Sequence, residues 1–288
     1  MTILVTGGNG QLGSTLRLAS AESRHRYIFT SRNELDITSA EAVEELMSNE
    51  KVDIVINCAA YTAVDLAEEN KAEADEVNHK AVAILAEVCK RHDATLIHIS
   101  TDYLYSGDTY EPYTEDTTPA PLNAYGRTKL AGEMAIAKSG CRYIILRTAW
   151  LYSEFGNNFV KKMCELFDSR DYVLVVADQI GTPTYARDLA EAIVAIIESE
   201  QHNKYGIYHY SNIGECSWFE FATEIARLKG ESKCDVLPCA TASYPTKAVR
   251  PEYTVLNKSK FLATFGIAIP EWQESLIQCI QNLQDYGG

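Results

Sequence analysis

The stretch Thr6-Gly7-Gly8-Asn9-Gly10-Gln11-Leu12-Gly13 decides the fold class of this chain. It follows the apolar run Ile3-Leu4-Val5 and leads into an amphipathic segment, which is the order strand, glycine-rich turn, helix. In such a turn Gly7 permits the tight bend, Gly10 lets the backbone approach a pyrophosphate, and Gly13 lets helix and strand pack closely. The helix N-terminus adds free N–H groups and a partial positive charge. Because glycine-rich turns also occur without a ligand, the turn alone leaves a purely structural role open.

The first half of the sequence alternates short apolar runs with amphipathic segments. We expect strands at Ile3–Thr6, Tyr27–Thr30, Asp53–Asn57, Thr95–Ser100 and Tyr143–Thr148, and helices at Gln11–Glu22, Ala40–Asn49, Ala72–Arg91 and Ala124–Lys138. The strands are apolar without alternation, as in a parallel sheet that helices cover on both faces. The pattern predicts an α/β fold with a Rossmann-type doubly wound parallel sheet, whose ligands bind beyond the carboxyl ends of the strands.

The pattern becomes less regular after Thr148. We expect helices at Phe159–Ser169, Leu189–Glu198, Trp218–Lys229 and Glu274–Leu283, strands at Val173–Val176 and Tyr208–Ser211, and a proline-containing stretch at Pro238–Pro251. The sequence therefore predicts a dinucleotide-binding domain over residues 1–150. Residues 151–288 are expected to form mainly a smaller C-terminal substrate-binding lobe, with segments that return to the main sheet.

Composition and charge bear on which partners and which cellular location the protein has. The chain has 288 residues, 46% of them hydrophobic, and a net charge of −14, which argues against nucleic acid or an anionic membrane as partner. No apolar stretch is long enough to cross a bilayer, and a strand that begins at Thr2 leaves no room for a signal peptide. The eight cysteines lack metal-ligand spacing, so we expect reduced thiols and a cytoplasmic protein. Phosphate-bearing ligands would then require local positive charge in the site.

Tyr125 and Lys129 lie one helical turn apart on the same face of a predicted helix, and Asn123 precedes it as a candidate N-cap. A phenol has an ordinary pKa of ~10, and a neighbouring ammonium group and the helix dipole favour the phenolate. We therefore expect a lowered pKa at Tyr125 and a role in proton transfer. Thr101 ends an apolar strand and could donate to a substrate carbonyl. A tyrosine and a lysine with this spacing also occur on exposed helices that have no catalytic role.

Thr101, Tyr125 and Lys129, after an N-terminal glycine turn, resemble the pattern of the extended short-chain dehydrogenases/reductases. Further motifs resemble the dTDP-4-dehydrorhamnose reductase family within that group, over essentially the whole chain: Ala59-Ala60-Tyr61-Thr62, Ser100-Thr101-Asp102-Tyr103, Arg147-Thr148-Ala149-Trp150, Gly156-Asn157-Asn158-Phe159, Asp178-Gln179-Ile180-Gly181-Thr182-Pro183-Thr184 and Arg250-Pro251. The resemblance implies an NAD(P)H-dependent oxidoreductase that reduces the C4 carbonyl of dTDP-4-dehydro-L-rhamnose to dTDP-L-rhamnose.

Cofactor and substrate residues follow from the turn, from the strand ends and from this resemblance. The expected cofactor-binding residues are Gly7, Gly10, Gln11, Leu12, Gly13, Ser31, Arg32, Asp36, Ile37, Ala59, Ala60, Tyr61, Thr62, Tyr125 and Lys129. The expected substrate-binding residues are Thr101, Asp102, Trp150 and Arg250, and the expected catalytic residues are Thr101, Tyr125 and Lys129. In that family the asparagine at the position of Asn78 also helps shape the site.

Three of these residues have equally simple structural interpretations. Trp150 offers a flat surface to the apolar face of a hexose, or it is a core tryptophan where two lobes meet. Asp36 could accept a hydrogen bond from adenine or cap the following helix. Arg250 could neutralise a diphosphate, because a guanidinium suits phosphate geometry, or pair with a surface carboxylate.

Two further features of the sequence bear on the choice between NADPH and NADH and on a metal site between subunits. The second predicted strand ends Phe29-Thr30-Ser31-Arg32, with no acid before Glu34, so NADPH is favoured and NADH is the alternative. Some members of the family join subunits through Mg²⁺ held by glutamates; Thr15 stands at the corresponding position of the first helix, so no metal site is predicted. A homodimer is one alternative for the assembly.

Two other functions compete with the reductase. One is a nucleotide-sugar epimerase or dehydratase on the same fold, although dehydratases usually carry an acid pair after the threonine and this chain reads Thr101-Asp102-Tyr103. The other is a non-catalytic, cofactor-binding regulatory subunit. An intact set of Thr101, Tyr125 and Lys129 argues against a pure binding module, which has no need of an acid.

Overall fold

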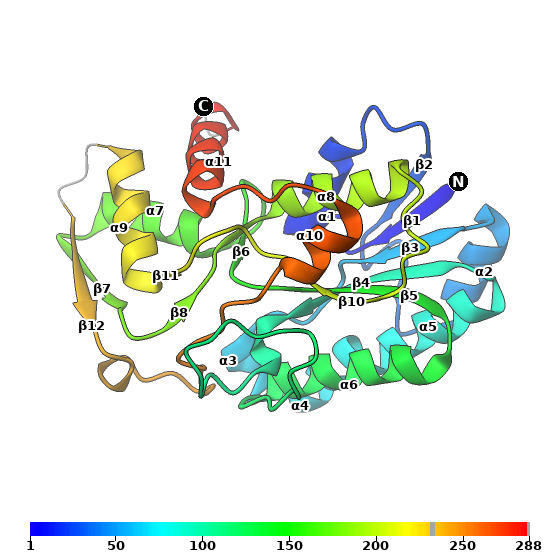
Figure 1. Cartoon of the computed structure of the whole chain (residues 1–288), viewed down its shortest axis with the longest axis horizontal. Coiled ribbons are helices and arrows are strands. Elements are labelled where there is room, and N and C mark those ends of the chain that lie inside the picture. Colours follow the sequence, from blue (N-terminus) through cyan, green and yellow to red (C-terminus); the bar gives the residue numbers. More distant parts are fainter. Residues whose placement is uncertain (231–233, 287–288) are drawn as a thin grey trace.

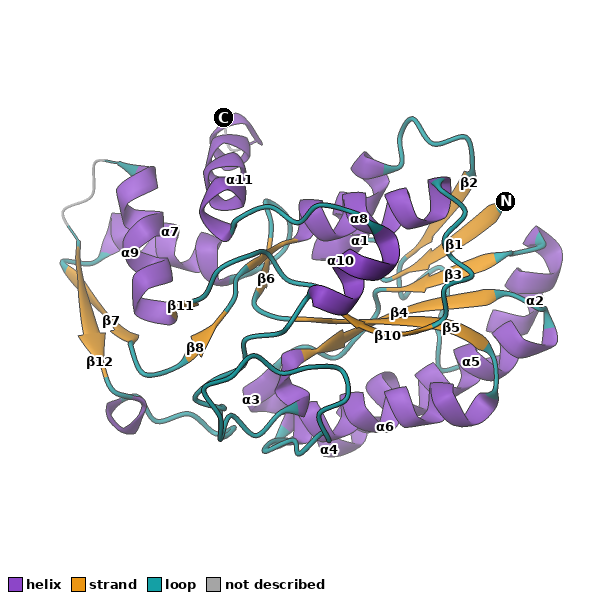
Figure 2. Cartoon of the chain, viewed as in Figure 1, coloured by secondary structure: helices purple, strands orange, loops and turns teal. Residues whose placement is uncertain are grey.

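A six-stranded parallel sheet forms the centre of the molecule (Figures 1 and 2). The computed structural model describes residues 1–230 and 234–286; residues 231–233 and 287–288, which fall within the predicted second lobe, lie outside the described residues. The strands are β1 (Thr2–Thr6), β2 (Arg26–Thr30), β3 (Ile54–Asn57), β4 (Thr95–Thr101), β5 (Arg142–Thr148) and β10 (Gly206–His209). Their order is β10-β5-β4-β3-β1-β2 with parallel neighbours, which confirms the predicted fold class. The strand order reverses between β1 and β3, where such sheets bind ligands.

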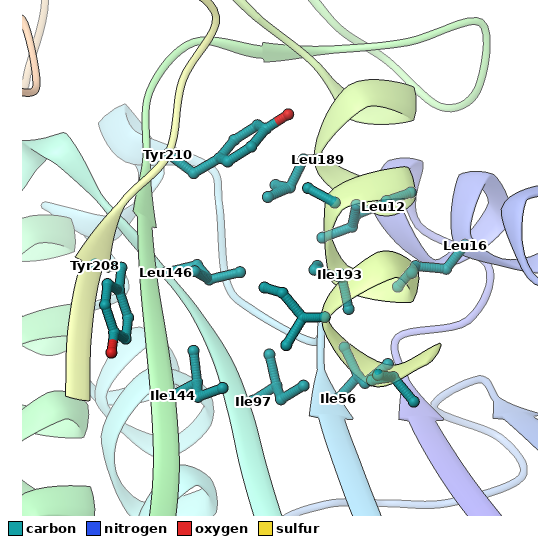
Figure 3. Close-up of a cluster of buried hydrophobic side chains, with 14 of the residues drawn as sticks. Leu12, Leu16, Ile56, Ile97, Ile144, Leu146, Leu189, Ile193, Tyr208 and Tyr210 are labelled. Carbon is teal, nitrogen blue, oxygen red and sulfur yellow. The ribbon is translucent and has the colours of Figure 1, made fainter. Parts of the chain in front are cut away.

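Helices cover both faces of this sheet. The helices α1 (Gln11–Ala19), α8 (Ala186–Glu198) and α10 (Ser259–Phe265) lie on one face, and α2 (Ala40–Glu50), α5 (Ala81–Arg91) and α6 (Ala124–Ser139) lie on the other (Figure 1). Ile3 and Val5 of β1 join the core beneath α1 and α8, whereas Leu4 joins the core on the opposite face. Figure 3 shows the first of these cores, with Leu146 of β5 facing Ile193 of α8. Two buried faces explain why the strands lack polar alternation.

The predicted helix over residues 72–91 is not a regular α-helix. It consists of α4 (Lys71–Asp75), a π-helical turn η1 (Glu76–Lys80) and α5, and the short α3 (Val64–Ala67) precedes it. Gly132 of α6 packs against η1 so closely that a Cβ there would collide with the Asn78 carbonyl oxygen. Single π turns inside helices are frequent at functional sites. Here the turn places the Asn78 side chain between α6 and the loop after β3.

The remaining elements form a second group around a core of their own. They are β6 (Leu151–Tyr152), α7 (Phe159–Ser169), β7 (Tyr172–Val176), β8 (Ile180–Gly181), β9 (Thr184–Tyr185), β11 (Cys216–Ser217), α9 (Trp218–Lys229), β12 (Asp235–Cys239) and α11 (Trp272–Tyr286). The structure also contains two short 3₁₀ turns, η2 (Asp102–Leu104) and η3 (Thr241–Ser243). Among the described residues, no helix combines the length and the apolar character that a membrane crossing needs.

Several predicted boundaries differ from the structure. The first helix ends at Ala19, three residues before Glu22, and the strand expected at Tyr208–Ser211 is β10 at the edge of the main sheet. Strand β12 was not predicted; it begins at Asp235 and ends in the proline-containing stretch that starts at Pro238. Proline is tolerated there because the β7–β12 sheet has only two strands, so each strand has a free edge.

Candidate active site

A cavity of about 600 Å³ opens at the carboxyl ends of the central strands. Many of the predicted site residues line it: Gly10, Gln11, Leu12, Gly13, Ala60, Thr62, Thr101, Asp102, Tyr125, Lys129 and Trp150. Asp102 and Lys129 are the charged residues of this lining. Lys129 is the basic side chain of this lining, so the backbone N–H groups at the start of α1 supply most of the positive charge that a phosphate ligand requires.

The glycine turn gives the cavity its anion-binding wall. Gly7 has a φ of 67°, and a Cβ there would lie 2.7 Å from the Ala59 nitrogen. A Cβ on Gly13 would lie 2.6 Å from the Gly8 Cα, so α1 can approach the turn only with glycine at this position. No side chain within the described residues caps α1, and its first turn holds no acid. The free N–H groups at this end of α1 thus fit the pyrophosphate of a dinucleotide.

Gln11 joins the glycine turn to the second half of the chain. Its Oε1 atom accepts hydrogen bonds from Ser153 Oγ at 3.1 Å and from Asn158 Nδ2 at 3.0 Å. Asn158 also caps α7, since its side chain accepts from the Lys161 N–H. Gly156, in the same loop, lines the cavity and packs against the Gln11 side chain. The loop over residues 153–158 therefore holds the amide of Gln11 at the cavity wall.

Asn78 fixes the loop that follows β3. Its Oδ1 atom accepts from the Tyr61 N–H at 2.9 Å, and its Nδ2 donates to the Tyr61 carbonyl at 3.0 Å. The same Nδ2 lies 3.2 Å from the Thr128 hydroxyl, on the helix turn that carries Tyr125 and Lys129. One fully buried side chain thus connects the Ala60–Thr62 segment to α6.

Thr101, Tyr125 and Lys129 converge from two elements, β4 and α6. Asn123 caps α6 as predicted, with its Oδ1 accepting from the Gly126 N–H at 2.8 Å. The expectation of a lowered Tyr125 pKa is wrong for the protein chain alone. Desolvation of the phenol raises this pKa to about 12, while a hydrogen bond with Thr101 lowers it and the Asp102 charge raises it. Tyr125 is therefore a protonated phenol at neutral pH, which is the form that can donate a proton.

Lys129 and Asp102 are both buried and both carry shifted pKa values. The Lys129 ammonium loses hydration, which lowers its pKa to about 8, and Nζ donates to the Ile99 carbonyl at 2.7 Å. Burial raises the Asp102 pKa to about 6, although the neighbouring Thr254 and Thr101 side chains oppose this change. Asp102 Oδ2 and Ser100 Oγ have no hydrogen-bond partner among the described residues. Buried polar atoms are seldom left unpaired, so these atoms are candidates for contacts with a ligand.

Trp150 forms an aromatic pair with Trp218. The two rings stack with centroids 3.6 Å apart at an angle of 11°, and both residues line the cavity. Trp150 adopts a φ of 46°, an uncommon conformation for a bulky residue. Trp218 was not among the predicted site residues, because a tryptophan at the start of an amphipathic helix is typical of a core residue.

Other predicted ligands lie outside the cavity lining. Arg250 donates to both carboxylate oxygens of Asp65, at 3.1 and 2.7 Å, which is the carboxylate pairing considered as an alternative. Asp36 accepts from Thr38 at 3.0 and 2.8 Å, whereas Ser39 caps α2. The remaining ones are Gly7, Ser31, Arg32, Ile37, Ala59 and Tyr61; Ile37 is 7% exposed and belongs to the core beside α2.

The end of β2 differs from the expected phosphate site. The Ser31 N–H and hydroxyl both lie 2.7 Å from Glu34 Oε2. These donors lower the pKa of the exposed Glu34 carboxyl, which is therefore ionised at neutral pH. A 2′-phosphate at Ser31 would have to displace this carboxylate.

Comparisons with known proteins agree with this geometry. The family model described as "RmlD substrate binding domain" matches residues 1–285. A dTDP-4-dehydrorhamnose reductase of Aggregatibacter actinomycetemcomitans is 40% identical, over 99% of this chain and 98% of that protein. The crystal structure of a dTDP-4-dehydrorhamnose reductase of Clostridium acetobutylicum superposes with a TM-score of 0.94 at 42% identity, over 99% of this chain and 100% of the other.

A second solved structure bears on the cofactor. The dTDP-4-dehydrorhamnose reductase of Bacillus anthracis, determined in complex with NADP, is 38% identical over 98% of this chain and 99% of that one, with a TM-score of 0.93. Family model, identity and structural likeness all extend over nearly the full length. This chain therefore belongs to the dTDP-4-dehydrorhamnose reductase family.

Proposed function

We propose that this protein reduces the C4 carbonyl of dTDP-4-dehydro-L-rhamnose to dTDP-L-rhamnose at the expense of NADPH, with NADH as the alternative donor. The observation that carries the proposal is the convergence of Thr101, Tyr125 and Lys129 at the cavity that the uncapped end of α1 also lines. The substrate comes from the names of relatives that match the whole chain. A reaction on a nucleotide sugar with a diffusible cofactor also supports the expected cytoplasmic location.

The proton chemistry falls to Tyr125. A nicotinamide cofactor bound against the glycine turn would supply the hydride. Tyr125 holds its proton at neutral pH, since desolvation raises its pKa to about 12, and it gives that proton to the developing alkoxide. Thr101 orients the same oxygen with its hydroxyl. Lys129 would hold the ribose hydroxyls of the cofactor and support the return of a proton to Tyr125.

The sugar would bind between Asp102 and the Trp150–Trp218 pair. Trp218 already covers one face of Trp150, so the sugar would meet the exposed part of the pair rather than a single ring. Asp102 Oδ2 would accept from a sugar hydroxyl, which would give this buried atom its missing partner. Arg250, which pairs with Asp65, would offer its remaining N–H groups to the diphosphate. In this arrangement residues 151–288 mainly close the substrate side of the cavity.

The Tyr125→Phe variant tests the proposal directly. We expect kcat to fall by on the order of 10² to 10⁴, because the proton donor is lost, with NADPH affinity retained. The measurement is absorbance of NADPH during turnover with dTDP-4-dehydrorhamnose, together with fluorescence titration of NADPH. Tyr208→Phe, which removes a hydroxyl that donates to the Lys204 carbonyl, is the control. Unchanged turnover in Tyr125→Phe would remove Tyr125 from the mechanism.

The same assay separates the competing functions. A reductase oxidises one NADPH per sugar reduced. An epimerase or dehydratase regenerates its cofactor, so the purified protein would contain NAD⁺ and would consume no NADPH. A regulatory subunit would bind NADPH and leave the sugar unchanged.

A further inference from the structure

A fully buried histidine lies directly behind Lys129 and has no role in the site described above. His98 interrupts the apolar run Leu96-Ile97-His98-Ile99 of β4. Its Nε2 atom is 3.3 Å from Lys129 Nζ, and its Nδ1 atom is 3.1 Å from Asn57 Nδ2. The protonation of this ring therefore determines what Lys129 meets on its buried side.

The orientation of the Asn57 amide fixes that protonation. The backbone N–H of Ala59 can only donate, and it lies 3.2 Å from Asn57 Oδ1. The Thr6 hydroxyl donates to the same oxygen at 2.6 Å. The amide is thus oriented with its NH₂ group towards His98 Nδ1. Because an amide NH₂ only donates, His98 Nδ1 must accept and carries no proton.

The proton of His98 must then be on Nε2, which faces Lys129. Burial and the charge of Lys129 lower the pKa of His98 well below its usual value, so the ring is neutral and has a single proton. An ammonium group has no lone pair with which to accept the Nε2–H, whereas a neutral amine has one. Lys129 itself donates to the Ile99 carbonyl. The hydrogen bonds therefore run in one direction, from Asn57 to His98, to Lys129 and to Ile99.

We propose that His98 is a positioning residue that donates Nε2–H to the side-chain nitrogen of Lys129 and so favours the neutral amine in the protein chain alone. Other groups around Lys129 act in both directions. Burial lowers its pKa, whereas Glu133, on α6, and Cys58, after β3, act in the opposite direction. Glu133 is itself bonded to Arg147 of β5. His98 adds a hydrogen-bond donor to these influences, with its Nε2 atom 3.3 Å from Lys129 Nζ.

The consequence for catalysis rests on the proposed function. A lowered Lys129 pKa weakens the positive field on Tyr125 and so favours the protonated phenol until an alkoxide forms beside it. A reductase needs this form, because its tyrosine must give a proton rather than take one. The tautomer of His98, in contrast, is a property of the chain and does not depend on which sugar is the substrate.

The first test is the tautomer of His98 in the unmodified protein. Nitrogen-15 NMR of histidine-labelled protein at pH 8 distinguishes a protonated from an unprotonated ring nitrogen, and His98→Gln identifies the His98 signals. We expect the proton on Nε2. His209 is an internal reference with the opposite tautomer, because its Nδ1 faces the Tyr113 carbonyl at 3.0 Å and its Nε2 faces the Tyr105 hydroxyl at 2.8 Å. A proton on His98 Nδ1 would overturn the proposal.

The second test is the titration of Lys129, followed by carbon-13 NMR of lysine labelled at Cε, with Lys129→Met to identify the signal. In His98→Leu the donor is lost, so we expect the Lys129 midpoint to rise by roughly one pH unit. If His98 instead accepted from an ammonium group, the midpoint would fall. A fall or no change would contradict the proposal. His79→Leu, which removes a partly exposed ring on η1, should leave the midpoint unchanged.

These readouts separate the two proposals. Both are made on the protein without substrate or cofactor, so a protein that fails to reduce the sugar can still show the Nε2 tautomer. If His98→Leu does not fold, the measurement on the unmodified protein still decides the question.

Discussion

Two buried polar clusters each include a residue of helix α6, Lys129 in one and Glu133 in the other, and they differ in how completely their groups are paired. In the paired cluster, formed by Tyr105, Glu133, Arg147 and His209, Arg147 donates to Glu133 at 3.0 and 2.6 Å and to the Tyr105 hydroxyl at 2.8 Å. That hydroxyl meets His209 at 2.8 Å, and His209 meets the Tyr113 carbonyl. The cavity cluster, formed by Ser100, Thr101, Asp102, Tyr125 and Lys129, leaves Ser100 Oγ and Asp102 Oδ2 without partners among the described residues.

The difference distinguishes polar groups that hold the fold together from polar groups that await a ligand. Both clusters are buried, and both contain ionisable residues with shifted pKa values, so burial and pKa alone do not separate them. Pairing does. A buried polar group with all its partners stabilises the native state, whereas one without a partner costs desolvation energy until a ligand binds.

The largest stability effect is expected in the paired cluster. Glu133→Gln leaves the buried Arg147 guanidinium without its counter-charge, which should lower the free energy of unfolding by about 3–5 kcal/mol. Urea denaturation measures this change. Glu191→Gln is the control, because Glu191 pairs with Arg187 on the exposed face of α8 and should contribute only about 0.3–0.5 kcal/mol. Equal losses in the two variants would show that the paired cluster is not the structural element described here.

In the cavity cluster, a buried charge should lower the free energy of unfolding, whereas in the paired cluster it raises it. The Asp102 pKa is about 6 in the folded chain against 3.8 without the fold, so the folded state favours the protonated carboxyl. The stability that this proton contributes is fully present below about pH 4 and is lost as the pH rises through 6. A shift of about two units corresponds to on the order of 3 kcal/mol.

Asp102→Asn removes this pH dependence. The difference in unfolding free energy between the unmodified protein and the variant should therefore decrease by up to about 3 kcal/mol from pH 4 to pH 7. Denaturation of both proteins across this range measures the change. Asp93→Asn, at an exposed position, is the control. A difference that stays constant with pH would show that Asp102 is not destabilised by burial.

The features of the fold and of the site that depend on short sequence segments could be predicted. The glycine turn, the unalternating strands and the interval between Tyr125 and Lys129 are properties of short segments. In the structure the start of α6 brings Tyr125 and Lys129 to the cavity at the carboxyl end of β4, where Thr101 lies. Asn123 as the cap of α6 is equally local.

Properties that depend on distant partners could not be predicted. Arg250 finds Asp65 across 185 positions of sequence, and Trp218 stacks on Trp150 from another element. The direction of the Tyr125 pKa shift depends on how much water the fold removes from the phenol, which no interval of residues reveals. His98 did leave a signal, because a histidine inside an otherwise apolar run requires polar partners in the core.

Two buried serines provide the smallest and most direct test of the contrast. Ser275 Oγ donates to Asp188 Oδ2 at 2.5 Å and meets Asn212 Nδ2 at 2.9 Å, whereas Ser100 Oγ has no partner among the described residues. Ser275→Ala should lower the free energy of unfolding by about 1–3 kcal/mol, since a hydrogen bond to a buried carboxylate is lost. Ser100→Ala should leave it unchanged or raise it by up to about 1 kcal/mol, since only the cost of burying an unpaired hydroxyl is removed. Both serines are nearly inaccessible to solvent, so the same substitution removes the same atom from a similar depth. Urea denaturation of the two variants therefore isolates pairing from burial, and equal losses would mean that Ser100 has a partner in solution and that the cavity cluster is as well satisfied as the paired one.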